Sequence, residues 1–159
     1  IAGEPREFAH QWPATPDVDP AGLGPLSGLA TALANGTGEW IVVISCDMPF
    51  VTGEVFTRLA AIAKPDADAV VPLQPDDRPQ PLCALYRRQT VQPIVKDLIQ
   101  GRDRSLLNLL SQISVQYSPF SAFRDLPYAE HLFFNINSPK DYERAKDICQ
   151  KVRSPATDV

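Results

Sequence analysis

The sequence predicts an α/β fold with a mostly parallel sheet, and three observations support this. The run Trp40 to Val51 is apolar and rich in β-branched residues, without the polar alternation of a half-exposed strand. Further short apolar runs follow along the chain, and segments with helical spacing of apolar residues separate them. Such alternation of strands and helices is typical of sheets whose faces are both covered by helices.

Length and composition describe one globular domain. The chain has 159 residues, and we expect a single domain over residues 1–152 followed by a tail over 153–159. A net charge of -4 argues against binding to nucleic acid. Three cysteines without a C-x-x-C pair look like reduced core thiols of a cytoplasmic protein. No apolar stretch approaches the roughly 20 residues of a membrane span.

The first part of the chain is predicted to be a long loop. Residues 5–24 are rich in proline and hold Asp17, and loops of this length in compact domains tend to be functional or disordered. A helix should begin at Pro25 and run to about Ala34, because proline suits the first helical turn. Asn35 and Gly36 then provide a stop, since both tolerate the left-handed conformation.

The glycines at this helix start allow two interpretations. Gly24 and Gly28 flank Ser27, which stands where G-x-G-x-x-G requires glycine, so the dinucleotide-binding motif is rejected. The glycines either allow close packing of the helix on the sheet or bring the backbone near an anionic ligand.

Asp47 ends the apolar run and is the main candidate site residue. Ligands of open α/β sheets bind beyond the carboxyl ends of the strands, where Asp47 is expected. An ionised carboxylate beside an apolar strand needs a metal ion or a strong donor as partner. A turn cap before Met48 and Pro49 is an equally good interpretation of this stretch alone.

The middle of the chain continues the alternation. Thr52 and Thr90 are expected to cap helices, and Gly101 should end the second of them. Arg78 and Arg104 lie in polar turns, where a phosphate-binding role competes with ordinary solvation. Strands are predicted at residues 69–73, 81–86 and 114–118, a short helix at 106–110, and irregular structure at 120–132.

The last informative stretch is Phe133 to Ser138. It is predicted to be a strand that ends in the two amides Asn135 and Asn137. Ser138 and Asp141 form a variant of the capping box, with Pro139 at the first helical position. The final helix should run to about Val152.

With these residues in view, the chain resembles the molybdenum cofactor guanylyltransferases of the MobA type. The matching motifs occur in order over almost all of the chain. They are Pro16-Asp17, Gly24-Pro25-Leu26-Ser27-Gly28, Cys46-Asp47-Met48-Pro49, Gln80-Pro81-Leu82 with Ala84-Leu85-Tyr86, and Asn135-Ile136-Asn137-Ser138-Pro139. The resemblance implies a three-layer α/β/α, Rossmann-like fold of the glycosyltransferase-A type. It also implies transfer of GMP from GTP to molybdopterin, with Mg²⁺ as cofactor and pyrophosphate as product.

The resemblance also implies roles for individual residues. Asp47 matches the aspartate that binds the magnesium ion on the GTP phosphates, and Asp17 matches one that contacts the nucleotide. Asn135 and Asn137 match amides near the pterin substrate and the metal. Gly24 and Gly28 match the helix start beside the nucleotide. Molybdoenzyme maturation proteins are candidate partners, and a cytoplasmic location is expected.

The chain departs from the family pattern at its start. The glycine-rich loop L-x-G-G-x-S-x-R-M-G and a following lysine are not among the 159 residues, so we expect the first strand of the fold to be missing. Two alternatives follow. One is a cytidylyltransferase acting on the same pterin, although Asn135 and Asn137 favour guanylyl transfer. The other is a noncatalytic binding domain that keeps the fold.

Overall fold

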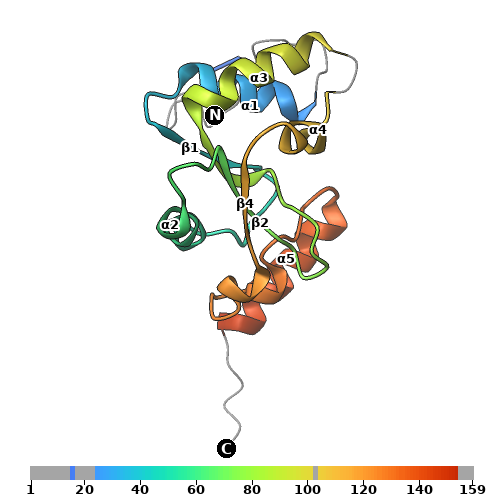
Figure 1. The fold of residues 1–159 in the computed structure, drawn as a ribbon. Helices are drawn as coiled ribbons and strands as arrows, with labels where there is room; N and C mark the ends of the chain where they lie inside the picture. Colours follow the sequence, from blue (N-terminus) through green and yellow to red (C-terminus); the bar gives the residue numbers. More distant parts are fainter. Residues whose placement is uncertain (1–14, 17–23, 102–103, 154–159) are drawn as a thin grey trace, which may run out of the picture.

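The computed structural model describes residues 15–16, 24–101 and 104–153. Among them, helices are interspersed with the strands of a sheet along the chain, so the α/β prediction is confirmed (Figure 1). The helices are α1 (Pro25–Asn35), α2 (Gly53–Ile62), α3 (Arg88–Gln100), α4 (Leu106–Ser111) and α5 (Pro139–Arg153), and the strands are β1 (Trp40–Ile44), β2 (Ala69–Pro72), β3 (Cys83–Arg87) and β4 (Val115–Ser118). Two short 3₁₀ helices, η2 (Phe120–Phe123) and η3 (Ala129–His131), occupy the segment expected to be irregular.

The four strands form one mixed sheet in the order β1-β3-β2-β4. Strand β3 lies antiparallel to both β1 and β2, while β2 and β4 are parallel. Strands β1, β2 and β4 therefore point in one direction, as expected for a mostly parallel sheet, and β3 runs against them. Consequently the carboxyl ends of β1, β2 and β4 lie at one edge of the sheet.

Buried side chains pack on both faces of the sheet. On one face Val71, Ala84 and Tyr86 join the apolar sides of α1, α3 and α4. On the other face Val70 and Leu85 join α2 and the segment from Phe123 to Leu132. Figure 1 shows α1, α3 and α4 together, with α2 on the opposite side. Alternate residues of one strand thus face different cores, which is the period-two pattern of a strand.

Strand β1 is less buried than its sequence suggests. Val42 is 51% exposed and Ile44 is 46% exposed, so the expectation that the strand is covered on both faces was wrong. The reason is strand order, because β1 is the outermost strand of the sheet in the part of the chain that the structure describes. A groove lined by Trp40, Val42 and Phe56 separates it from α2.

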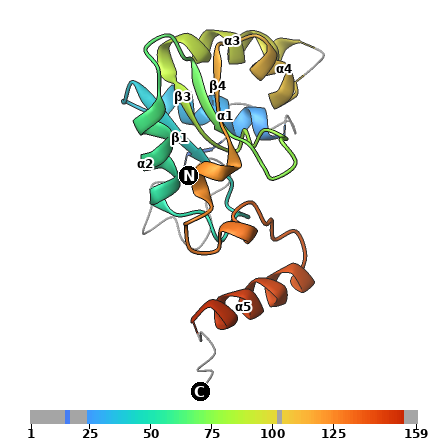
Figure 2. The same ribbon diagram turned by 60° about the horizontal axis from the view of Figure 1, so that its bottom comes forward.

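Helix α5 belongs to a third, smaller cluster. Ala145 and Ile148 are buried against Phe50, whereas Tyr142 on the same helix is 54% exposed. Figure 2 shows α5 at the far end of the molecule from α3 and α4. The helix therefore covers the loop that follows β1 rather than the middle of the sheet.

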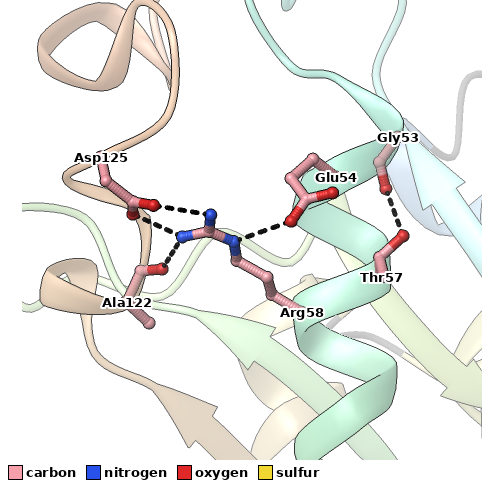
Figure 3. A network of polar contacts seen from close by, with 6 residues as sticks. All are labelled: Gly53, Glu54, Thr57, Arg58, Ala122 and Asp125. Carbon is pink, nitrogen blue, oxygen red and sulfur yellow. Dashed lines mark hydrogen bonds and ion pairs between the residues drawn. The ribbon is translucent and has the colours of Figure 1, made fainter.

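A network centred on Arg58 joins α2 to the segment after β4 (Figure 3). The guanidinium group donates to both carboxylate oxygens of Asp125, at 2.5 and 2.8 Å, and to the carbonyl oxygen of Ala122 at 2.7 Å. It also donates to Glu54, one turn earlier on α2, at 3.1 Å. The Asp125 contact is bidentate, the strongest arrangement for an arginine and a carboxylate.

The helix ends show which local predictions were correct. At α5 the capping box is confirmed, since the Asp141 N–H donates to Ser138 Oγ and Ser138 Oγ donates to the Asp141 carboxylate. Gly101 ends α3 as predicted. Thr90 does not cap α3, because the helix already begins at Arg88. Thr52 occupies the expected cap position of α2 without a side-chain hydrogen bond.

Gly36 ends α1 for a different reason from the one predicted. Its φ angle is -69°, which is not left-handed. A Cβ atom at this position would overlap Cδ1 of Ile41. A side chain here would displace the end of the Ile41 side chain and lie 3.0 Å from the carbonyl oxygen of Ala32, so the close approach of the helix end to β1 favours glycine.

The cysteines and the segment before α5 also differ from expectation. Cys83 is a buried core thiol, and burial raises its pKa to about 12, but Cys46 is exposed. Residues 133–138 form no strand. Ile136 donates one backbone hydrogen bond to the loop after β1, and no strand pairs with this segment in the described structure. The prediction of a strand here was therefore wrong.

Candidate functional site

Asp47 lies three residues beyond the end of β1, at the carboxyl edge of the sheet. The loop is held on one side by the Ser45 N–H, which donates to the carbonyl oxygen of Leu82 at 2.8 Å. The Met48 N–H closes a turn on the carbonyl oxygen of Ser45 at 3.4 Å. Both hydrogen bonds fix the backbone on either side of Asp47.

The side chain of Asp47 has a buried acceptor without a partner. The residue is half-buried, and Oδ1 is buried without a hydrogen bond among the described residues. A carboxylate acting only as a turn cap would spend its oxygens on backbone N–H groups. A buried, unpaired carboxylate oxygen is costly and indicates a partner such as a cation.

Asn135 has the same property and comes from the other end of the chain. Its Oδ1 atom is buried and unpaired in the described structure. The next residue, Ile136, donates its N–H to the carbonyl oxygen of Asp47 at 2.9 Å. The structure thus brings together the Asp47 and Asn135 motifs, which the sequence separates widely.

Asn137 has a different environment. It is exposed, and its backbone N–H donates to the carboxylate of Asp141 at 3.2 Å, inside the cap of α5. The cap of α5 therefore fixes the chain direction at the point where it leaves Asn135. Of the two amides, Asn135 is the one with an unused buried acceptor.

A hard cation fits the donor atoms at this edge. Carboxylate and amide oxygens are ligands that Mg²⁺ accepts, and Mg²⁺ needs few protein ligands because it keeps several waters. No group of three or more His, Cys, Asp or Glu side chains able to hold a metal occurs among the described residues. The unpaired oxygens of Asp47 and Asn135 therefore suit an ion that shares its shell with water and phosphate.

The Gln80-Pro81-Leu82 and Ala84-Leu85-Tyr86 motif supports the Asp47 loop. The hydroxyl of Tyr86, a fully buried residue, donates to the carbonyl oxygen of Pro81 at 2.8 Å. Leu82, next in the chain, accepts the hydrogen bond from Ser45. This motif positions Asp47 through the backbone and contributes no side chain to the candidate metal site.

The glycine motif lies at the start of α1. Gly24 has a φ angle of 62°, a conformation that favours glycine. At Gly28 a Cβ would meet no described atom within 4 Å, so close packing within the described structure does not explain this glycine. The alternative, an open backbone approach for a ligand at the helix start, remains a prediction.

The remaining predicted site residues have local partners or lie outside the described residues. Asp17 falls outside them. Arg78 pairs with Asp76 at 2.6 Å within its own loop. Arg104 donates to the carbonyl oxygen of Gly101 at 3.1 Å, at the end of α3. Both described arginines thus have structural roles in turns.

Sequence reasoning missed a cavity of about 240 Å³ next to this edge. Its lining comes from the loop after β2, the segment from η2 to η3 and α5, and includes Gln74, Phe120, Glu130, His131, Phe133, Phe134 and Arg144. The ring of Phe50, in the loop that carries Asp47, lies 6.1 Å from the rings of both His131 and Phe134. The adjacent aromatic residues Phe133 and Phe134, directly before Asn135, were the available sequence signal.

Comparison with known proteins agrees with this geometry. Residues 1–115 match the family model described as MobA-like NTP transferase domain. A protein named probable molybdenum cofactor guanylyltransferase from Bacillus cereus is 35% identical over 91% of this chain and 71% of its own length. One of the same name from Bacillus licheniformis is 34% identical over 80% of this chain, which spans 63% of that relative.

Solved structures share the fold. The molybdopterin-guanine dinucleotide biosynthesis protein A from Archaeoglobus fulgidus superimposes with a TM-score of 0.73 at 33% identity, over 87% of this chain and 68% of that one. A protein from Aquifex aeolicus superimposes with a TM-score of 0.68 at 19% identity, over 87% of this chain and 70% of that one, and shows the fold alone. From the matched family model and these relatives, the chain belongs to the MobA-like NTP transferase domain family.

Proposed function

We propose that this protein transfers GMP from GTP to molybdopterin in a magnesium-dependent reaction. The observation that carries the proposal is the pair of buried, unpaired oxygens on Asp47 and Asn135 at the carboxyl edge of the sheet. Membership of the NTP transferase family and relatives named as guanylyltransferases support the choice of GTP. The two residues would hold Mg²⁺, which supplies charge neutralisation on the phosphates.

The chemistry needs positioning more than a protein nucleophile. An oxygen of the terminal phosphate of molybdopterin forms a bond to the α-phosphorus of GTP. The bond from that phosphorus to the bridging oxygen breaks, and pyrophosphate leaves with the electron pair. Asp47 and Asn135 orient the reacting phosphates, and the Asp47 loop is held rigid by the Ser45 and Ile136 hydrogen bonds. The start of α1, with Gly24 and Gly28, is the proposed contact for the nucleotide phosphates.

Nucleotide choice provides the direct test. Pyrophosphate release is measured with molybdopterin and saturating Mg²⁺, with GTP and CTP compared at equal concentration. We expect GTP to be the better substrate by kcat/KM. A preference for CTP would make the protein a cytidylyltransferase, and no release with either nucleotide would favour a noncatalytic domain.

Asp17 is proposed to contact the nucleotide. Replacement by alanine should raise KM for GTP more than it lowers kcat, because the lost contact is made equally in the ground state and in the transition state. Steady-state kinetics of Asp17→Ala measure this split. An effect confined to kcat would contradict a binding role.

No helix among the described residues is long and apolar enough to cross a membrane. We propose a cytoplasmic location, where GTP is available.

A further inference from the structure

The cavity beside Asp47 opens at the same edge of the sheet as the candidate metal site. Gln74 follows β2 and Phe120 follows β4, and both strands point in the same direction as β1. Ligands of α/β sheets bind at this edge. The cavity is therefore placed where a substrate of the proposed reaction can reach the metal site.

Direct contacts join the cavity wall to the Asp47 loop. Phe134 lines the cavity, packs on Phe50 and is followed by Asn135. Ile136 then donates its backbone hydrogen bond to Asp47. One elongated ligand could accordingly place a phosphate at Asp47 and its other end in the cavity.

The lining suits a flat heterocycle with polar edges. Phe120, Phe133 and Phe134 are half-buried and offer ring faces and edges for stacking. The guanidinium carbon of Arg144 lies 5.3 Å from the centre of the Phe134 ring, which leaves N–H donors available for acceptor atoms or an anionic group. Glu130 adds an exposed carboxylate that can accept hydrogen bonds from ring N–H and amino groups.

The two substrates of the proposed reaction are then separated by the sheet. The helix α1, with the glycine motif, packs in the core on one face. Phe123, Leu132 and Phe133, on the segment that builds the cavity wall, pack in the core on the other face. A nucleotide at the start of α1 would leave the cavity free for the acceptor.

From these observations we propose that this cavity binds the pterin ring of the acceptor, with Arg144 and Glu130 as its specificity-determining polar residues. The assignment rests on the proposed function for the identity of the acceptor. Neither Arg144 nor Glu130 belongs to the sequence motifs described above. The phosphate end of the acceptor is thereby assigned to Asp47. The ring end is assigned to Arg144 and Glu130.

The test measures binding of a pterin separately from catalysis. Pterin-6-carboxylic acid, a stable fluorescent pterin, is titrated into the wild-type protein and into Arg144→Ala and Glu130→Gln. Lys146→Ala is the matched control, because Lys146 is exposed on the same helix, pairs with Glu143 and does not line the cavity. GTP binding is measured in parallel for each variant.

We expect Kd for the pterin to rise about tenfold in Arg144→Ala and Glu130→Gln, the effect of losing a hydrogen bond to a charged group. Lys146→Ala should bind the pterin like the wild type, and all variants should bind GTP equally. Arg144→Lys should recover only part of the affinity, since lysine lacks the planar fork of arginine.

Absence of pterin binding by the wild type would overturn the assignment, and so would unchanged pterin binding in both Arg144→Ala and Glu130→Gln. Weakened GTP binding in both variants would also overturn it, because the cavity would then bind the nucleotide. Failure of the proposed function is distinguishable from these. Absence of GMP transfer, together with pterin binding that depends on Arg144 and Glu130, would defeat the proposed reaction and leave the pocket assignment standing.

Discussion

Two aspartates, Asp125 and Asp47, occupy opposite electrostatic situations in this molecule. Asp125 lies on the surface, and both of its carboxylate oxygens accept hydrogen bonds from Arg58. Asp47 is half-buried at the sheet edge, and one of its oxygens has no partner among the described residues. Burial without a partner is costly, whereas a bidentate pair at the surface is satisfied. Asp125 is therefore a carboxylate that joins two segments, whereas Asp47 is a carboxylate available to a ligand.

The largest predicted effect comes from Asp47. Asp47→Asn should lower kcat about 100-fold or more, because the proposed metal ligand loses its negative charge while its shape is kept. The free energy of unfolding should not fall, since an unpaired buried charge is removed. Activity assays and denaturant unfolding measure both quantities. Asp125→Asn is the matched control, and it should lower the free energy of unfolding while kcat stays unchanged. Unchanged turnover of Asp47→Asn at saturating Mg²⁺ would falsify the proposed metal role.

Tyr86 provides an intermediate case, a buried polar group that is satisfied. Tyr86→Phe should lower the free energy of unfolding by about 1 kcal/mol, because the carbonyl oxygen of Pro81 loses its hydrogen bond. Urea unfolding measures the change. A variant as stable as the wild type would show that this bond contributes nothing net to the fold.

Arg58 should affect stability and not catalysis. Arg58→Ala removes the contacts to Asp125, Ala122 and Glu54, so α2 loses its polar connection to the segment after β4. A smaller fall in thermal stability than for Tyr86→Phe is expected, with kcat unchanged, since the network is open to solvent. A double-mutant cycle with Asp125→Ala isolates the pair, and additive effects would mean that the two side chains do not interact in solution.

The smallest effect is the pH dependence of the same pair. The hydrogen bonds from Arg58 lower the pKa of Asp125 from its ordinary value of 3.8 to about 2. A lowered folded-state pKa stabilises the fold above the ordinary value, and this contribution is lost as the pH falls from about 4 towards 2. The stability difference between wild type and Asp125→Asn should therefore shrink over this interval. A difference that stays constant there would argue against the shift.

Local signals in the sequence predicted much of the fold. The box formed by Ser138 and Asp141 and the stop at Gly101 depend on neighbouring residues only, and both are present. The burial of β1 could not be predicted, because it depends on strand order. Residues 133–138 were assigned to a strand since apolar runs do not reveal whether a partner strand exists.

The candidate site was predictable in part. The motif at Asp47 identified a carboxylate at a sheet edge, but its pairing with Asn135 came from family resemblance and not from spacing. The cavity could not be found, because its lining is assembled from Gln74, Phe120 and Arg144 on separate segments. Such sites depend on tertiary packing, which no local pattern encodes.

The hydrogen bond from Ile136 to Asp47 has a consequence for the order in which the protein is made. Asp47 belongs to the first strand of the described sheet, but its loop acquires this partner only when the segment before α5 is present. A ribosome-bound chain can form the β1-β3-β2-β4 sheet before the proposed metal ligands Asp47 and Asn135 are brought together. The proposed metal site is therefore completed only after the sheet, and a chain interrupted before Asn135 should form the sheet without acting on nucleotide.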